Sequence, residues 1–206
     1  MVRPNSELLN EARESLSGRW GLAIGGFLIG GLITGVSQNI PFIGLIISLI
    51  ITGPMMLGLA VFAQSYARKD KEPQIDQVFS GFQNFGTALV TYLLMVLYIF
   101  LWMLLLIIPG IIAALSYSQA FFILADNPSL SASEVLSKSK EIMDGHKLKL
   151  FFLGFNFIGW SFLCILTLGI GFLWLIPYMK VSYASFYNEI SNGQVPVIVE
   201  DDEILV

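Results

Sequence analysis

The sequence predicts an all-α fold, a polytopic membrane helical bundle of six transmembrane helices arranged as three hairpins. The chain has 206 residues, of which 55% are hydrophobic and 13% are charged, whereas soluble domains average about 25% charged residues. Ten of the eleven Lys and Arg residues lie in short polar stretches. Between those stretches run 48, 49 and 39 nearly uncharged residues, which are 20–67, 77–125 and 150–188. Each run is long enough for two membrane-crossing helices of about 20 residues and a turn.

A turn signal divides each uncharged run into two apolar halves. The signals are Gln38-Asn39-Ile40-Pro41, Pro109-Gly110 and Gly169-Ile170-Gly171, and these residue types favour turns over continued helix. Because the runs do not alternate polar and apolar residues, helices are the structure that can satisfy the backbone in lipid. The transmembrane helices are therefore predicted at 20–38, 42–66, 87–108, 110–125, 148–169 and 171–190.

An amphipathic interfacial helix is predicted before each hairpin. The first and third carry Ser or Asn capping candidates at the start, apolar residues at helical spacing, and Gly18 or Gly145 at the end. A shift of 127 positions aligns Ser6-Glu7-Leu8-Leu9 with Ser133-Glu134-Val135-Leu136. A shorter middle version begins at Asp76.

These similarities indicate three tandem copies of an interfacial helix and a hairpin, all of one orientation. The repeat units are about 5–66, 75–126 and 131–190, within a single integral membrane domain, 1–190. Pro54, Pro109 and Pro177 are expected at or near the start of the second helix of each hairpin, and pseudo-threefold packing is the expectation. Residues 191–206 form an acidic tail. We expect this tail to be disordered, with docking on a partner as the alternative.

The placement of the cations predicts the orientation of the chain. The three predicted turns carry no Lys or Arg, whereas the opposite side carries ten. By the positive-inside rule both termini are cytoplasmic, and the protein is a multi-pass protein of a bacterial inner or plasma membrane. Because residues 5–18 are polar, the first span is expected to act as its own insertion signal.

Several motifs in the second half of the chain point to a known family. They are Leu124-Ala125-Asp126-Asn127-Pro128, the segment from Ser137 to Lys147, Phe157-Ile158-Gly159-Trp160, and the segment from Leu166 to Tyr178. With these motifs the chain resembles a bacterial polytopic membrane family known only as domain of unknown function nine-seven-five, from the first amphipathic helix to about Ile190. In architecture it is also similar to the membrane domain of some glycerophosphodiester phosphodiesterases. The phosphodiesterase domain itself is missing from this chain, so the resemblance implies a fold and no activity.

Lys180 is the one cation inside an uncharged run. It lies nine residues before Glu189, about 13 Å along a helix and therefore near the middle of the bilayer. A cation at that depth costs at least ~2.5 kcal/mol, so it should face protein, water or an anion. A binding site for a lipid phosphate or another anion is one interpretation, with Tyr183 and Tyr187 on the same polar stripe and Ser182 and Ser185 beside them. The alternative is a lysine that snorkels to an interface or bonds carbonyls freed by Pro177.

Two glutamines stand at equivalent positions of the proposed repeat. Gln64 and Gln119 each follow a hairpin proline by ten residues. With Ser116 and Tyr117 they could line a neutral polar passage and contribute to a ligand site. Such residues more often form hydrogen bonds between membrane helices, worth about 0.6 kcal/mol each.

Two further patterns suggest contacts with lipid and with other helices. Lys138, Lys140, Lys147 and Lys149 form a basic surface that could bind anionic lipid head groups. Gly21, Gly25, Gly26, Gly30, Gly31 and Gly35 form a ladder of four-residue steps that allows close helix approach. An internal helix is the expected partner of the ladder, and a second subunit is the alternative.

The sequence carries no signature of a metal, a cofactor or a reaction. His146 is the only histidine and has no second ligand at a metal-binding spacing, and Cys164 is expected to serve in packing. No predicted span contains Asp or Glu away from its ends, since Asp126 and Glu189 lie at the predicted cytoplasmic ends; this argues against proton-coupled transport. No nucleophile with a base, paired carboxylates or phosphate-binding loop is found, so we expect no cofactor, no nucleic-acid partner and no enzyme activity.

These observations favour a non-enzymatic membrane scaffold or transporter component that handles a lipid or another amphipathic or anionic molecule. The expected partners are membrane lipids, with a membrane-protein partner or a homo-oligomer as further possibilities. The alternative function is an accessory or regulatory subunit that docks on another membrane protein.

Overall fold

The computed structural model describes residues 3–38, 44–68 and 72–191, and all regular structure in these ranges is helical. This confirms the all-α fold class. The predicted turn at Asn39–Pro41 and nearly all of the tail 191–206 lie outside the described residues. The elements are α1 (Asn5–Leu16), α2 (Trp20–Gln38), α3 (Gly44–Ala67), the 3-10 helix η1 (Ile75–Phe82), α4 (Phe85–Leu105), α5 (Ile107–Tyr117), α6 (Ala120–Asp126), α7 (Ala132–Ile142), α8 (Lys147–Leu166) and α9 (Phe172–Ser191).

Four described helices are long and apolar enough to cross a membrane. They are α3, α4, α8 and the continuous stretch Ile107–Asp126, which contains α5 and α6. A fifth candidate is the pair of α1 with Trp20–Gly35 of α2, which is bent by 99°. Gly18 makes this bend possible because its φ is 77°, a value that favours glycine. The chain therefore has the helices of a membrane protein.

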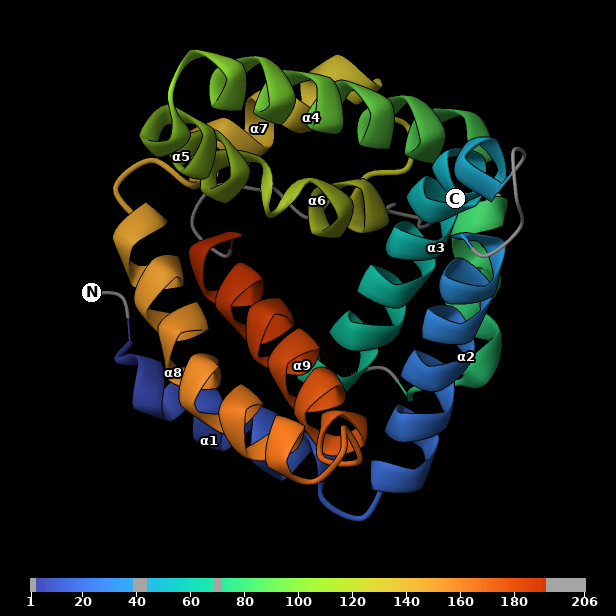
Figure 1. Ribbon diagram of the computed structural model, residues 1–206, viewed down its shortest axis with the longest axis vertical. Coiled ribbons are helices and arrows are strands. Elements are labelled where there is room, and N and C mark those ends of the chain that lie inside the picture. Colours follow the sequence, from blue (N-terminus) through green and yellow to red (C-terminus); the bar gives the residue numbers. More distant parts are fainter. Residues whose placement is uncertain (1–2, 39–43, 69–71, 192–206) are drawn as a thin grey trace, which may run out of the picture.

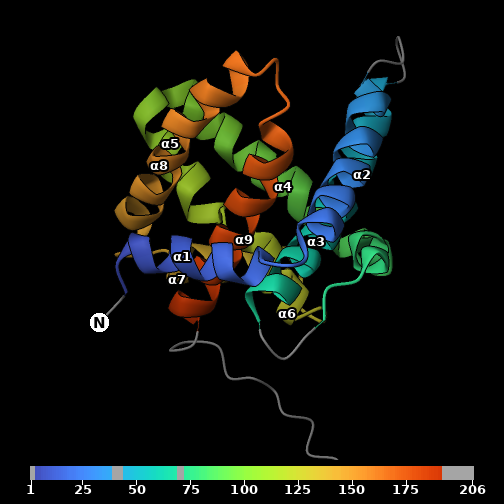
Figure 2. The ribbon, with the colours of Figure 1, turned by 90° about the horizontal axis from the view of Figure 1, so that it is seen from below.

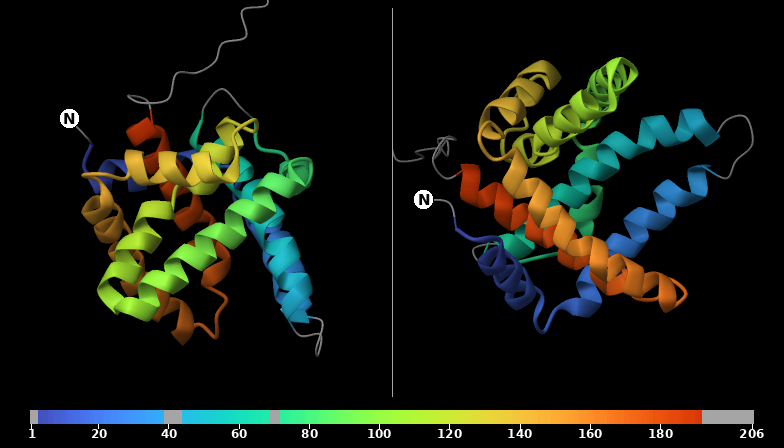
Figure 3. Two further views of the ribbon diagram at one scale, coloured as in Figure 1. Left: turned by 90° about the horizontal axis from the view of Figure 1, so that it is seen from above. Right: turned by 60° about the vertical axis from the view of Figure 1, so that its left-hand side comes forward.

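The long helices form three packed pairs, α2 with α3, α4 with α5, and α8 with α9 (Figure 1). The α2–α3 and α8–α9 pairs can also be followed by their colours in Figure 3. In Figure 2 the far ends of α2 and α3 and the α8–α9 turn lie at the top, and α1, α6 and α7 lie toward the bottom. The turns and the short helices thus lie on opposite sides of the molecule.

The short helices join the three pairs into a ring. Helix η1 precedes the α4–α5 pair and packs against α3 of the pair before it. Helix α7 precedes the α8–α9 pair and packs against α4, α5 and α6 of the preceding pair. Helix α1 precedes the first pair, and it packs against α9 of the last pair. Each short helix therefore packs against the pair before the one that it precedes in the chain, and α1, which packs against the last pair, closes the ring.

The helix predicted at 110–125 is broken in two. Helix α5 ends at Tyr117 and α6 begins at Ala120. At the break, the Ser118 hydroxyl donates to the Leu115 carbonyl at 2.7 Å, a local bond that competes with the regular helical ladder. The turn before α5 falls at Leu106, whose backbone is extended, and not at Pro109-Gly110. Pro109 is the third residue of α5, where its missing N–H leaves no helical bond unmade.

The predicted caps are confirmed for α7 but not for α1. Ser131 caps α7, and Glu134 completes a capping box with it; these hydrogen bonds hold the pKa of the Glu134 carboxyl below its ordinary value. Helix α1 has no side-chain cap, because its N-cap residue is Pro4, whose side chain carries no hydrogen-bond acceptor; the Asn5 amide donates to the Lys149 carbonyl at 3.2 Å. The predicted middle helix is the 3-10 helix η1, whose capping box is formed by Gln74 and Gln77.

Two of the six glycines in the ladder on α2 face an internal partner. A side chain at Gly26 would meet Phe62 of α3, and one at Gly30 would meet Leu59 of α3. Gly21, Gly25 and Gly31 have open space around them. The close approach that these glycines predict is therefore used at least in part inside the molecule, between α2 and α3.

Candidate functional site

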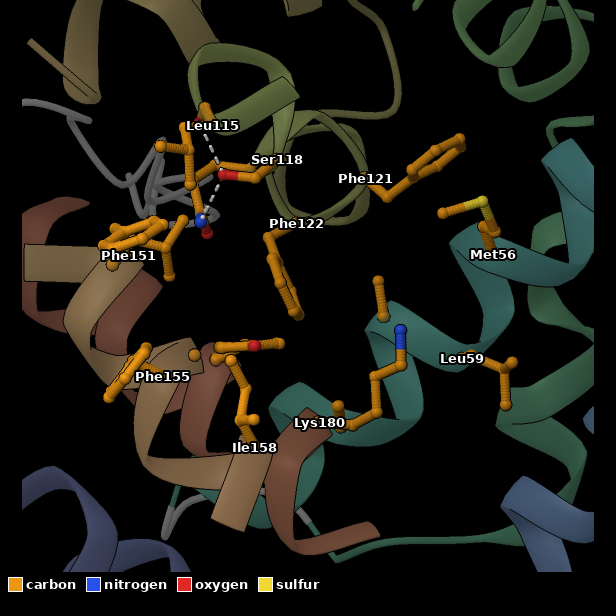
Figure 4. Close-up of a pocket in the computed structure, with 16 residues that line it drawn as sticks. Met56, Leu59, Leu115, Ser118, Phe121, Phe122, Phe151, Phe155, Ile158 and Lys180 are labelled. Carbon is orange, nitrogen blue, oxygen red and sulfur yellow. Dashed lines mark hydrogen bonds between the residues drawn. The ribbon is translucent and has the colours of Figure 1, made fainter. Parts of the chain in front are cut away.

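The described residues enclose a cavity of about 410 Å³ between the helix pairs (Figure 4). Its wall comes from α3, from the α5–α6 segment, from α8 and from α9. Most of the wall is apolar, with Met56, Leu59, Phe121 and Phe122 among its residues. Ligand sites typically have volumes of about 300–1,000 Å³, so the cavity is large enough for a small molecule or one end of a larger one.

Lys180 is one of the few polar residues of this wall. Its side chain leaves α9 and carries its Nζ atom into the cavity, in the space between Phe122 and Met56 (Figure 4). Across the part of the chain that the structure describes, no hydrogen bond or ion pair involves this ammonium group. An ammonium group in apolar surroundings is stable only with an anion, water or carbonyl partner. The geometry therefore leaves room for a negatively charged partner.

Gln119 lies on the same wall and is also incompletely paired. Its side chain is 1% exposed, and its Nε2 donates to the Ser118 hydroxyl oxygen at 3.0 Å. Its Oε1 atom is buried and has no hydrogen-bond partner among the described residues. A buried polar atom without a partner costs about 1–3 kcal/mol, so this acceptor would be stabilised by a hydrogen-bond donor.

Tyr183 is the third predicted site residue on the wall. Its ring packs edge-on against Phe157, with the ring centroids 6.1 Å apart. Its hydroxyl lies next to Gly154 of α8, where an added Cβ would be 3.3 Å away. The structure thus brings Lys180, Gln119 and Tyr183 together around one cavity.

Gln64 and Tyr187 lie behind the wall and support it. Both are buried, at 4% and 0% exposure. Gln64 Nε2 donates to the Phe122 carbonyl at 3.2 Å, and the Tyr187 ring stacks on Phe122 with centroids 5.5 Å apart. Gln64 therefore makes the hydrogen bond between helices that is predicted above as the common role of such residues. The neighbouring Ser182 hydroxyl donates to the Tyr178 carbonyl at 2.8 Å, and Ser185 is buried.

A charged cluster that sequence reasoning missed ties the three pairs together. Arg68 donates from both terminal nitrogens to the Asp126 carboxylate, at 2.8 and 2.7 Å. The Tyr187 hydroxyl donates to the same carboxylate at 2.8 Å, and Arg68 Nε donates to Asn188 Oδ1 at 3.1 Å. These residues follow or belong to α3, α6 and α9. The sequence shows that these residues lie at helix ends. It does not show that Arg68 pairs with Asp126, which is 58 residues away.

The four lysines predicted to bind lipid head groups have different surroundings. Lys140 and Lys147 lie at a smaller groove of about 180 Å³ that Trp102 and Tyr117 also line. Lys147 also lies 3.8 Å from the Asp144 carboxylate. Lys149 lies 3.4 Å from the Glu189 carboxylate and donates to the Arg3 carbonyl. Lys138 is half-buried on α7. The described residues contain no cluster of His, Cys, Asp and Glu suited to a metal ion.

Comparison with known proteins identifies the family of this chain. The family described as "Protein of unknown function (DUF975)" matches residues 1–116 and 103–194. No curated protein matches the chain. No solved structure matches it either. Because the two matched segments together span nearly the whole sequence, the chain belongs to this family of unknown function, DUF975.

Proposed function

We propose that this protein is a non-enzymatic membrane protein that binds an anionic amphipathic molecule, such as a lipid, in its central cavity. The observation that carries the proposal is Lys180, which places an unpaired ammonium group inside a mostly apolar cavity. Such a site matches a molecule with a negative group and an apolar body. The polar side chains of the wall are an amine, an amide and hydroxyls, a set suited to binding.

We also propose that α2, α3, α4, the α5–α6 segment, α8 and α9 form six spans, arranged as three hairpins of one orientation. The three packed pairs and the ring of short helices support this arrangement. The ten Lys and Arg residues other than Lys180 lie outside the proposed spans or at the start of α8, and by the positive-inside rule they support a cytoplasmic location for both termini. In this arrangement Lys180 is near mid-bilayer, where an anion is its most effective partner.

The proposal is tested by the lipid that purifies with the protein. Wild type, Lys180→Met and Arg13→Met would be purified in a mild detergent and their bound lipids measured by mass spectrometry. We expect Lys180→Met to lose an anionic species that wild type retains, because methionine keeps the apolar stem and removes the charge. Arg13→Met is the matched control, since Arg13 is an exposed cation on α1.

The folded state of each variant would be checked by its thermal unfolding. We expect Lys180→Met to be at least as stable as wild type, because removal of an unpaired, partly buried cation relieves its desolvation cost. Equal amounts of anionic lipid in wild type and Lys180→Met, with both folded, would show that the cavity does not bind through this charge.

A further inference from the structure

The orientation of the Gln119 amide determines which hydrogen-bonding group a ligand needs. The Ser118 hydroxyl donates its hydrogen to the Leu115 carbonyl at 2.7 Å, so toward Gln119 it can only accept. The atom 3.0 Å away must therefore be the Nε2 donor of Gln119. This fixes Oε1 as the unpaired atom, and a ligand that satisfies it must carry a hydrogen-bond donor.

Two polar groups of opposite character thus lie on one wall. Lys180 donates and carries positive charge, and Gln119 Oε1 accepts. A ligand with a simple negative group would pair with the first and leave the second unpaired. A ligand with a negative group and a neighbouring hydroxyl or N–H would pair with both.

The volume and the opening of the cavity limit the apolar part of the ligand. About 410 Å³ is near the lower end for ligand sites, so a head group and one chain fit better than a head group and two. Phe151, Phe155 and Ile158 line the cavity and are 45%, 60% and 48% exposed. They follow one another at i, i+4 and i+7 on α8, so one stripe faces both the cavity and the outside. The cavity therefore opens beside α8, toward the surface that would face lipid.

We propose that the cavity selects a single-chain amphiphile whose anionic head group carries a hydroxyl or another hydrogen-bond donor, and that this ligand enters from the membrane beside α8. This inference rests on the proposed function and adds the ligand class. A monoacyl glycerol phosphate with a free hydroxyl has this chemistry, as does a hydroxy fatty acid.

The test compares two probes that differ in one hydrogen-bond donor. Oleoyl lysophosphatidic acid and its O-methyl ether, in which the free hydroxyl is blocked, would be offered in equal amounts to the full-length protein in nanodiscs of zwitterionic lipid. Native mass spectrometry would give the ratio of the two bound species. We expect wild type to favour the hydroxyl probe about tenfold, because the ether leaves Gln119 Oε1 unpaired.

Three variants separate the two interactions. Gln119→Leu should bring the ratio close to one without weakening the ether. Ser118→Ala should also lower the ratio, because the Gln119 amide can then rotate; Ser118 is exposed, so this variant stays informative if Gln119→Leu fails to fold. Lys180→Met should weaken both probes and change the ratio little.

The lateral entry is tested with two glycines of α8. Gly154→Leu places a side chain in the cavity wall and should weaken both probes at least tenfold. Gly159→Leu is its matched control, since Gly159 lies on the same helix with open space around it. Equal binding by these two variants would overturn the entry beside α8.

The possible outcomes test the ligand class separately from the proposed function. A wild-type ratio near one, with both probes weakened by Lys180→Met, would overturn the donor requirement and keep the proposed function. Unchanged binding in folded Lys180→Met, or no binding of either probe to wild type, would overturn both. A free hydroxy fatty acid that displaces the phosphate probe would assign the site to fatty acids.

Discussion

At the scale of single residues, the described charged side chains differ in whether they form an ion pair. Arg68 and Asp126 hold each other in a two-point ion pair with 27% and 18% of their side chains exposed. Lys180 has no such partner among the described residues. Because a partly buried charge is costly without a partner, the Arg68–Asp126 pair is expected to stabilise the fold and Lys180 is expected to serve binding.

Removal of one partner of the ion pair tests the first half of this statement. Asp126→Asn leaves the Arg68 guanidinium without its carboxylate, and we expect a loss of about 2–3 kcal/mol in the free energy of unfolding. Tyr187→Phe removes one hydrogen bond to the same carboxylate and should cost about 1.5 kcal/mol. Thermal unfolding in detergent measures both.

Tyr98→Phe is the control for the tyrosine change, because the Tyr98 hydroxyl makes no hydrogen bond within the described ranges and the side chain is 38% exposed. It should change stability by less than about 0.5 kcal/mol. If Asp126→Asn were as stable as wild type, the cluster would have no role in holding the three pairs together.

The sequence singled out those residues of the candidate site that are unusual in their local context. Lys180 could be singled out because it interrupts an apolar run, and the structure places it on the cavity wall beside Gln119 and Tyr183. The unpaired acceptor of Gln119 could not be predicted, because it depends on the helix break at Ser118. The partner of Arg68 could not be predicted either, since a contact over 58 residues depends on the tertiary packing.

At the scale of elements, small residues allow the backbones of α3 and η1 to touch. A Cβ added at Gly58 would overlap the Val78 carbonyl of η1, and one added at Gly81 would overlap the Pro54 carbonyl of α3. Both obstacles are backbone atoms, which cannot move aside without shifting a helix. The contact therefore tolerates no side chain at either position.

Gly58→Ala and Gly81→Ala test this contact. Each should lower the free energy of unfolding by about 3 kcal/mol, the upper part of the range for overpacked sites. Gly86→Ala in α4 is the control, because an added Cβ meets nothing within 4 Å there and alanine favours helix by about 0.5–1 kcal/mol. Equal stability of Gly58→Ala and Gly86→Ala would contradict the close approach.

The uncharged apolar runs predicted the long helices well and their interruptions poorly. The helices expected at 148–169 and 171–190 begin within one residue of α8 and α9. Pro54, expected near the start of its helix, lies in the middle of α3, because apolar residues on both sides continue the helix. The break after Tyr117 and the 3-10 form of η1 depend on local hydrogen bonds that a hydrophobic pattern does not encode.

At the scale of the whole molecule, the proposed threading gives all three hairpins one orientation. The short helices α1 and α7 lie toward the end of the molecule opposite the α8–α9 turn (Figure 2), which supports this proposal. We therefore expect a cytoplasmic reporter to be active when fused to either terminus, and a periplasmic reporter to be active when inserted at the α4–α5 or α8–α9 turn.

The topology experiment has a clear internal control. Insertion of the same reporters between α6 and α7 should give the cytoplasmic result, because Asn127–Leu130 lies on the side of the ten cations in the proposed threading. Opposite locations for the two termini would exclude six spans.

The contact of α1 with α9 also sets an order of assembly. Helix α1 is made first, but its partner α9 is made last, from Phe172 onward. At a synthesis rate of about 5–20 residues per second, the interval is on the order of 10–30 s. During that time the apolar face of α1 lacks its contacts with α9. This face contains Leu8, Ala12 and Leu16, which are fully buried in the finished protein. We therefore expect the apolar face of α1 to be covered by lipid or by another protein until α9 is synthesised.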